Sequence, residues 1–203
     1  MTPILATVHP AFVLRARRWE GVLRSDVAKA LRHARGELRW RDPEIVLDPT
    51  VGELDGALEA LGAKKLAAVD TETDGLEPLT CKLRCIQVSD VDGEVAIVIP
   101  FLSIDGSTTF YTSTDLVEIR AMLRDWLTDP SKIKTGHNFG YYDRMVLEQA
   151  LGVTPTPVLD TLVLHRLCWS ELPHNLGFVG STLADVVIAW KAGKLAVKVE
   201  RDI

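Results

Sequence analysis

The sequence has little cysteine, and its three cysteines form no closely spaced pair. They are Cys81, Cys85 and Cys168, an odd number without a C-x2-C motif. This pattern argues against a disulfide framework or a zinc knuckle and is typical of a reducing cytosol. Apolar runs are also short, since none approaches the roughly 18 residues of a membrane helix, and the start of the chain lacks the order of a signal peptide. We therefore expect a soluble, cytoplasmic protein with no membrane partner.

An overall basic charge, which would point directly to nucleic acid, is missing as well. The chain of 203 residues has a formal net charge of −5 at pH 7. This balance does not exclude a nuclease, because carboxylates that hold cations contribute to it. The hydrophobic fraction of 47% and the charged fraction of 25% are ordinary for a globular protein. The length is sufficient for one domain with an appendage or for two small domains.

The first 40 residues differ from the rest because basic side chains dominate them. Ser25 predicts the start of a helix that ends at Gly36, with apolar positions at helical spacing between them. Two Asp-Pro pairs follow and predict a linker over residues 43–60. A single helix cannot bury a core of its own, so residues 1–42 are expected to form a strand-helix appendage that docks on something else.

From Lys64 onward, the pattern alternates between strands and helices. The runs that predict strands are 65–70, 83–89, 94–101 and 132–137. The segments with helical periodicity are 115–126, 141–151, 161–169 and 182–190. A hairpin turn signal, Asp90-Val-Asp-Gly93, separates the second and third strands. This order predicts an α/β fold in which helices flank a mixed sheet.

Two carboxylates stand at the end of the first of these strands. Residues two apart on a strand point to the same face, so Asp70 and Glu72 are expected to project together. Such a pair repels itself unless a cation lies between the two groups, and hard oxygen ligands suit Mg²⁺ or Mn²⁺. Taken alone, the motif is also what a solvated turn displays.

A second motif follows about 65 residues later. Gly136-His137-Asn138 ends a predicted strand, and Asp143 stands on the first turn of the next helix. Helix capping is one explanation of Asp143, because the helix dipole favours a carboxylate there. Together with Asp70 and Glu72, however, the arrangement indicates a third carboxylate at one site.

These segments resemble the DEDD proofreading 3′→5′ exonucleases, which have a ribonuclease H-like fold. Val69-Asp-Thr-Glu-Thr-Asp-Gly-Leu76 matches their first motif, Thr135-Gly-His-Asn-Phe-Gly-Tyr-Tyr-Asp143 their second, and Asp160-Thr161 the start of the helix that follows. The resemblance is to the exonuclease domains of family A DNA polymerases, especially phage versions. It places an exonuclease domain over residues 61–203.

The resemblance implies a two-metal site and a set of substrate contacts. Its catalytic residues and ligands of two Mg²⁺ or Mn²⁺ ions are Asp70, Glu72 and Asp143. Its residues that contact the substrate are Thr73, Leu76, Asn138 and Tyr142. The implied partners are the 3′ end of single-stranded DNA and a DNA polymerase domain or subunit, in a bacterial or phage-infected cell.

Two departures from the family pattern stand out. The spacing from Asn138 to Asp143 is five residues, where many bacterial relatives have four. The third motif, which supplies the last metal-binding Asp and a Tyr or His general base, would follow Lys191 and is missing before Ile203. We therefore expect a truncated chain that is impaired as an isolated enzyme. The alternatives are a catalytically incomplete nucleic-acid-binding fragment and an RNA-trimming exonuclease.

The amino-terminal segment carries a resemblance of its own. Thr7-Val-His-Pro-Ala-Phe-Val-Leu-Arg15 is similar to the carboxyl end of family 4-type uracil-DNA glycosylases, with His9 and Pro10 at the matching positions. The uracil pocket and the cluster ligands of those enzymes have no counterpart in this chain. Because base excision requires such a pocket, residues 1–42 are expected to be a remnant without glycosylase activity.

Overall fold

The computed structural model describes residues 5–38 and 43–184. They form two compact units. Unit 1 joins residues 5–38 to residues 168–184, and unit 2 spans residues 43–167. Within the described part of the chain, no helix is long and apolar enough to cross a membrane.

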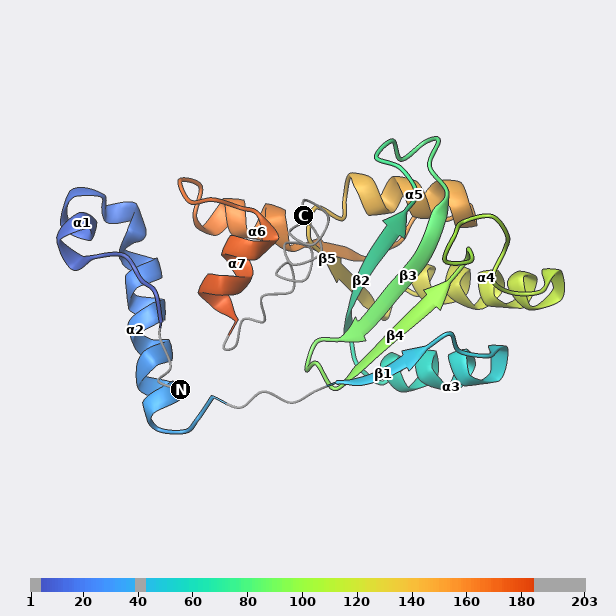
Figure 1. Ribbon diagram of the computed structural model, residues 1–203, viewed down its shortest axis with the longest axis horizontal. Helices are drawn as coiled ribbons and strands as arrows, with labels where there is room; N and C mark the ends of the chain where they lie inside the picture. Colours follow the sequence, from blue (N-terminus) through green and yellow to red (C-terminus); the bar gives the residue numbers. More distant parts are fainter. Residues whose placement is uncertain (1–4, 39–42, 185–203) are drawn as a thin grey trace, which may run out of the picture. The chain divides into compact units, whose positions relative to one another are not determined.

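A six-stranded sheet is the centre of unit 2 (Figure 1). Its strands are β1 (Glu44–Leu47), β2 (Leu66–Thr73), β3 (Leu83–Asp90), β4 (Val95–Pro100), β5 (Ile133–Gly136) and β6 (Val158–Asp160). The strand order is β1-β4-β3-β2-β5-β6. Strands β2, β3 and β4 pair antiparallel, whereas the pairs β1–β4, β2–β5 and β5–β6 are parallel. The predicted mixed sheet is therefore confirmed.

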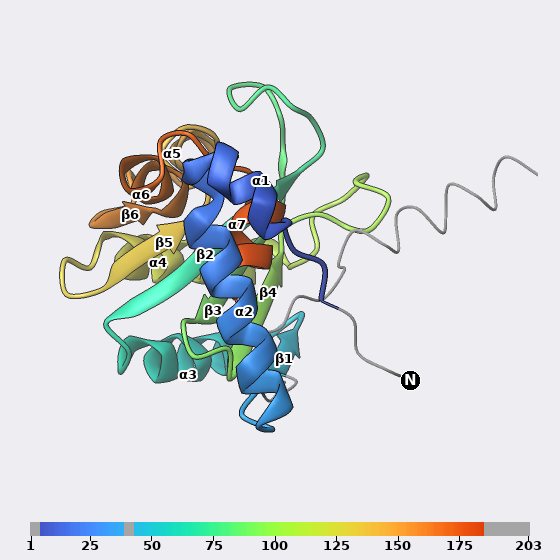
Figure 2. The ribbon, with the colours of Figure 1, turned by 90° about the vertical axis from the view of Figure 1, so that its left-hand side faces the viewer.

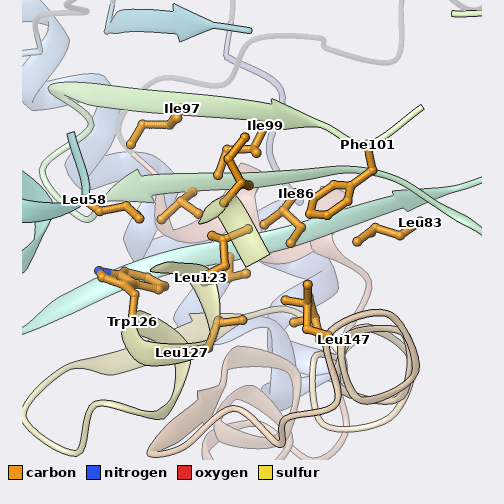
Figure 3. Packing of buried hydrophobic residues seen from close by; sticks show 14 of the residues in the cluster. Leu58, Leu83, Ile86, Ile97, Ile99, Phe101, Leu123, Trp126, Leu127 and Leu147 are labelled. Atoms are coloured by element: carbon orange, nitrogen blue, oxygen red, sulfur yellow. The ribbon is translucent and has the colours of Figure 1, made fainter. Parts of the chain in front are cut away.

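The core of unit 2 lies between this sheet and three helices. The helices of the unit are α3 (Val51–Gly62), α4 (Ser113–Thr128), α5 (Tyr142–Leu151) and α6 (Thr161–Cys168), of which the first three supply the core. Alternation along the strands turns Val69, Ile86 and Ile99 toward these helices, where each is at most 3% exposed. Figure 3 shows Leu123 of α4 and Leu147 of α5 among the side chains that pack against the strands. This packing fixes the start of α5 near the end of β2.

The predicted linker over 43–60 is wrong, because these residues form β1 and α3. Thr50 caps α3 in a capping box with Glu53, in which each side chain binds the other residue's backbone N–H. Leu54, Leu58 and Leu61 of α3 are at most 5% exposed and belong to the core. The prolines that suggested a linker stand at the entries of a strand and a helix, where proline is tolerated.

Lys134 of β5 is completely buried. Its ammonium group donates hydrogen bonds to the backbone carbonyls of Asp129, Lys132 and Thr156, at 2.9, 2.8 and 2.7 Å. All three donors of the ammonium are thereby used, which offsets the cost of burying a charge. Burial lowers the pKa of Lys134 to about 8. The side chain ties the loops on both sides of β5 to the strand.

Unit 1 is helical over its described residues, so the strand of the predicted strand-helix appendage is not found there. Its elements are α1 (Pro10–Arg15), the 3-10 turn η1 (Arg17–Trp19), α2 (Glu20–Ala34) and α7 (Leu176–Leu183). Figure 2 shows α1 set across one end of the long helix α2. Helix α2 begins before the predicted cap Ser25. Most of the helix predicted over 182–190 lies outside the described residues.

Helices α2 and α7 are held together by polar and aromatic contacts. Ser25 Oγ donates to the carbonyl of Thr182 at 2.6 Å, and Lys29 Nζ donates to that of Ser181 at 2.7 Å. Both acceptors belong to the last turn of α7, whose carbonyls have no partner within the helix. Trp19 and Phe178 meet edge to face, with ring centroids 5.9 Å apart. The amino-terminal segment therefore docks on a segment far along the chain.

Candidate active site

The end of β2 presents two carboxylates on one face of the sheet. Asp70 and Glu72 are exposed, whereas Thr71 between them is buried on the other face. On the neighbouring strand β3, Gln87 stands opposite Asp70 and Cys85 stands opposite Glu72. The cross-strand partners of the two acids are therefore a neutral amide and a thiol, and neither side chain compensates the charge.

Asp143 reaches this strand end from the first turn of α5. Its Oδ1 accepts the backbone N–H of Thr71 at 3.0 Å and the Thr71 hydroxyl at 2.6 Å. The Asp143 side chain is buried, and its position on the first turn places it in the favourable end of the helix dipole. Thr71 therefore links the third carboxylate directly to the strand that carries the other two. Asp143 also lies close enough to Asp70 for its charge to raise the pKa of that carboxyl.

The electrostatics of this group are those of crowded carboxylates. Partial removal from water raises the pKa of Asp70 to about 6, and the charges of Asp143 and then Glu72 add to the shift. Burial also raises the pKa of Asp143, although the hydrogen bonds from Thr71 offset part of that effect. Hard oxygen donors that repel one another fit a divalent cation such as Mg²⁺ or Mn²⁺. Both Thr71 bonds end on Oδ1 of Asp143, so they do not use its other oxygen.

Asp160 fixes the loop of the second motif rather than serving as another open carboxylate. Its oxygens accept the backbone N–H groups of Asn138, Gly140 and Leu162 at 2.9–3.0 Å. Burial raises the pKa of Asp160, but these hydrogen bonds outweigh it and leave the pKa below its ordinary value. Asn138, predicted as a substrate contact, has a φ of 65° and so adopts the left-handed conformation that asparagine tolerates. The Asp-Thr pair in the sequence was the signal for this anchor.

Phe139 belongs to the same loop as Asn138. It is completely buried, so it packs in the core. A side chain at Gly136 would lie only 2.8 Å from the Phe139 ring and from the carbonyl of Val69. Glycine is therefore required for the end of β5 to approach β2. Tyr141, by contrast, is 66% exposed and remains open for stacking.

The loop after β2 is fastened by Tyr142. The Tyr142 hydroxyl donates to the carbonyl of Gly75 at 2.6 Å and lies 2.7 Å from Thr73 Oγ1. Thr73 Oγ1 also donates to the Gly75 carbonyl at 2.7 Å. Two residues predicted to contact substrate therefore shape the loop that carries a third, Leu76. That leucine is 95% exposed, so it does not belong to the core.

A second acidic group lies in the turn between β3 and β4. Ligand atoms of Asp90, Asp92 and Glu94 all lie within 4.8 Å of one another. Lys64 Nζ lies 2.5 Å from Asp92 Oδ2 and 3.6 Å from Glu94 Oε2, and Asp90 Oδ1 accepts the backbone N–H of Glu94. A lysine and backbone groups thus compensate this group, which stands at the opposite end of β2 from Glu72.

Comparison with known proteins identifies the family. The family model described as 3′-5′ exonuclease matches residues 49–197. The chain belongs to the 3′-5′ exonuclease family. This match confirms the predicted resemblance to a 3′-5′ exonuclease domain. No curated protein sequence matches the chain.

Solved structures of nucleases resemble this exonuclease. Brucella melitensis NrnC bound to pGG is 30% identical, with a TM-score of 0.54 over 72% of this chain and 64% of NrnC. NrnC with bound Mg²⁺ is 29% identical, with a TM-score of 0.53 over 73% of this chain and 65% of NrnC. Escherichia coli RNase D is 24% identical, with a TM-score of 0.53 over 77% of this chain and 36% of RNase D, a likeness that shows the fold alone. The exonuclease thus spans less than two thirds of the length of NrnC.

Proposed function

We propose that this chain hydrolyses the terminal phosphodiester at the 3′ end of single-stranded nucleic acid and releases nucleoside monophosphates. The observation that carries the proposal is the arrangement of Asp70, Glu72 and Asp143. They come from a strand and a helix 70 residues apart in the sequence, and the Thr71 hydrogen bonds to Asp143 join them. Burial, and then the charges of Asp143 and Glu72, raise the pKa of Asp70. Such a cluster suits cations that in turn bind a phosphodiester.

The three carboxylates would hold two Mg²⁺ or Mn²⁺ ions between them. Asp70, whose pKa responds to the charges of Asp143 and Glu72, would share in holding these ions with the other two carboxylates. Cations so placed neutralise the charge of the scissile phosphate and make water a better nucleophile. Hard oxygen donors such as these carboxylates favour Mg²⁺ and Mn²⁺ over softer metal ions. The Mg²⁺ in the similar NrnC structure agrees with that choice.

The loops around the carboxylates would place the terminal nucleotide. Leu76 projects into solvent from the loop that Tyr142 and Thr73 fasten, so it can wedge beside the terminal base. Asn138, on the loop that Asp160 anchors, would position the substrate or the Asp143 turn. In this proposal Thr73 and Tyr142 act chiefly by shaping the loop, since each already has a hydrogen-bond partner there.

The sugar of the preferred substrate can be deoxyribose or ribose, and a different observation favours each. The sequence motifs resemble proofreading domains and favour single-stranded DNA, with a DNA polymerase domain or subunit as partner. The solved structure of NrnC with pGG favours short oligonucleotides and, with them, an RNA-trimming role. A protein distinguishes RNA from DNA through contacts to the 2′-hydroxyl. Parallel assays on the two sugars therefore decide between the candidates.

The test is cleavage of 5′-labelled DNA and RNA oligonucleotides of one sequence in Mg²⁺ or Mn²⁺. The proposal expects a ladder that shortens from the 3′ end, disappears with a chelator and is abolished by Asp70→Asn. Asp92→Asn is the matched control, because it removes an acid of the compensated hairpin group and should leave the ladder unchanged. The faster of the two substrates identifies the sugar preference.

A second readout keeps the test independent of turnover. Millimolar Mn²⁺ should raise the melting temperature of the wild type and of Asp92→Asn but not of Asp70→Asn, since a ligand that binds only the folded state stabilises it. A chain without a ladder and without a Mn²⁺ shift would contradict the proposal. A Mn²⁺ shift and oligonucleotide binding without cleavage would instead support the nucleic-acid-binding fragment.

A further inference from the structure

Charge is divided unequally between the two units. The described residues of unit 2 include ten Lys and Arg and twenty Asp and Glu, a net charge of −10. Those of unit 1 include seven basic and four acidic residues, a net charge of +3. The negative net charge of unit 2 repels a polyanion, and the positive net charge of unit 1 attracts one. If the substrate is a polyanion, unit 1 is therefore electrostatically the more favourable of the two units for binding it.

Half of the cations of unit 2 are already engaged. Lys64, Lys132 and Arg144 form ion pairs with acids of the same unit. Lys134 is buried against three carbonyls, and Arg84 donates to the carbonyl of Ile104. The remaining basic residues of the described part of this unit are Lys65, Lys82, Arg120, Arg124 and Arg166. These five are outnumbered by the twenty acids around them.

Helix α2 turns one face inward and leaves arginines on the other. Val22, Asp26 and Lys29 are at most 8% exposed on the inward face, where Lys29 contacts α7. Four exposed arginines in and beside this helix form what we call the arginine face. It consists of Arg17 in η1, Arg24 and Arg32 in α2, and Arg35 directly after α2, where it lies 3.9 Å from Glu37. The exposed apolar residues Val27 and Leu31 share the outward side of α2.

The spacing of these residues places them on one side. Arg24 and Arg35 are eleven residues apart, which is about three turns and roughly 16 Å along a helix. Arg32 lies one turn before Arg35, and Arg17 precedes Arg24 by two turns with Glu20 between them. The side chains of Arg17 and Arg24 are 72% and 77% exposed although each pairs with Glu20. Exposed pairs of this kind are weak, so a stronger anion can displace the glutamate.

We propose that the arginine face binds the sugar–phosphate backbone of the nucleic acid on which the active site acts. The inference rests on the proposed function for the identity of the ligand and on the charge division for the location. Guanidinium groups suit phosphates because their planar donors match the phosphate oxygens. Since the two units belong to one chain, contacts at this face raise the effective concentration of the strand at the active site. The amino-terminal segment then supplies affinity, and unit 2 supplies chemistry.

The test compares the salt dependence of binding for two triple variants of the full chain. Arg24, Arg32 and Arg35 are changed to Gln in the first variant. Lys65, Arg120 and Arg124, three exposed cations of unit 2, are changed to Gln in the control. Binding of a fluorescent single-stranded oligonucleotide is followed by anisotropy in a chelating buffer between 50 and 300 mM salt. We expect the slope of log affinity against log salt to fall by roughly 2 in the first variant, since each phosphate contact contributes about 0.7. The control variant should keep the wild-type slope.

The measurement contains no cleavage step, so it is separate from the test of the proposed function. Equal slopes for the two variants would overturn the arginine face even if the wild-type chain cleaves oligonucleotides. Vesicles of phosphatidylserine and phosphatidylcholine provide a second polyanion. Binding to these vesicles that depends on the arginine face, with unchanged slopes for oligonucleotides, would also overturn the proposal. Melting curves of both variants verify that the changes leave the fold intact.

Discussion

Asp70 has the pKa that matters most for a cation at this site. Its value in the folded chain is about 6, above its ordinary 3.8, so the metal-free folded state holds a proton more tightly than the unfolded state does. The resulting stabilisation is complete below pH 3.8 and is lost as the pH rises through 6. Cation and proton compete for the same oxygens. We expect the Mn²⁺-induced rise in melting temperature to be larger at pH 7.5 than at pH 5, as calorimetry can measure.

Cleavage should follow the same titration and fall about tenfold for each pH unit below 6. Asp70→Asn provides the control, because it removes both the proton site and the ligand and should show no rise in melting temperature with Mn²⁺ at either pH. A Mn²⁺ response in the wild type that is equal at both pH values would contradict the role of Asp70.

Thr71 tests how far the carboxylates depend on a neighbour that carries no charge. Thr71→Val removes the hydroxyl that binds Asp143 Oδ1 and keeps the shape of the side chain and the backbone hydrogen bond. Loss of a residue that orients a metal ligand typically costs about 10- to 100-fold in metal affinity or activity. We expect a weakening in that range, measured by Mn²⁺ titration. Thr71→Ser keeps a hydroxyl and should restore most of the affinity. Equal binding by the Val and Ser variants would show that the hydroxyl is dispensable.

Among the elements, α3 is the one whose role sequence reasoning misjudged. Leu54 in the middle of this helix is completely buried, whereas Leu47 at the end of β1 is 62% exposed. Leu54→Ala should lower the free energy of unfolding by about 2–5 kcal/mol, the usual cost of a buried leucine. Leu47→Ala, the same change at an exposed site, should cost much less. Urea unfolding of both variants checks the contrast. A small effect of Leu54→Ala would be the result expected for the linker that the structure excludes.

Strands β2, β3, β4 and β5 could be predicted because their signals are local, whereas β1 and the three-residue strand β6 were not predicted. Alternating apolar residues and a hairpin turn signal predict strands around Val69, Ile86 and Ile97, and the structure has a strand at each of these places. Strand β1 could not be predicted, because its four residues gain their pairing only from β4, about 50 residues later. Helix α3 follows a proline pair, and its capping box was read as part of a linker. A contact distant in the sequence therefore decided β1, whereas α3 carried a local signal, its capping box, that the prediction missed.

The residues of the candidate site also fall into those that local patterns predict and those that they do not. Asp70 and Glu72 follow from the period of a strand, and Asp143 follows from its motif. The partners that hold these groups do not follow from any local pattern. The hydroxyl of Thr71, the backbone donors around Asp160 and the Tyr142 bond to Gly75 depend on how three elements meet. A sequence motif therefore identifies the acids but not what orients them.

At the scale of the whole molecule, the integrity of unit 1 depends on Lys29. Its ammonium donates to the carbonyl of Ser181, so Lys29→Met leaves a carbonyl in the last turn of α7 without its donor. Such a loss typically costs about 1–3 kcal/mol. We expect faster hydrogen exchange of the amides of α7 and unchanged exchange in β2 and β3. Arg18→Met, at an exposed position of η1, should leave exchange in both units unchanged. Exchange in α7 that does not respond to Lys29→Met would contradict this role.

The contact between α2 and α7 has a consequence for the order of events on the ribosome. The bonded residues Ser25 and Thr182 are separated by 157 positions, and the whole of unit 2 is synthesised between them. At about 5–20 residues per second, the amino-terminal helix waits roughly 8–30 seconds for its partner to be translated. The sheet of unit 2 can meanwhile form from strands that lie next to one another in the chain. Helix α2 is thus synthesised long before its native neighbour α7, and in that interval its basic side chains face the nascent chain's surroundings, ribosomal RNA included.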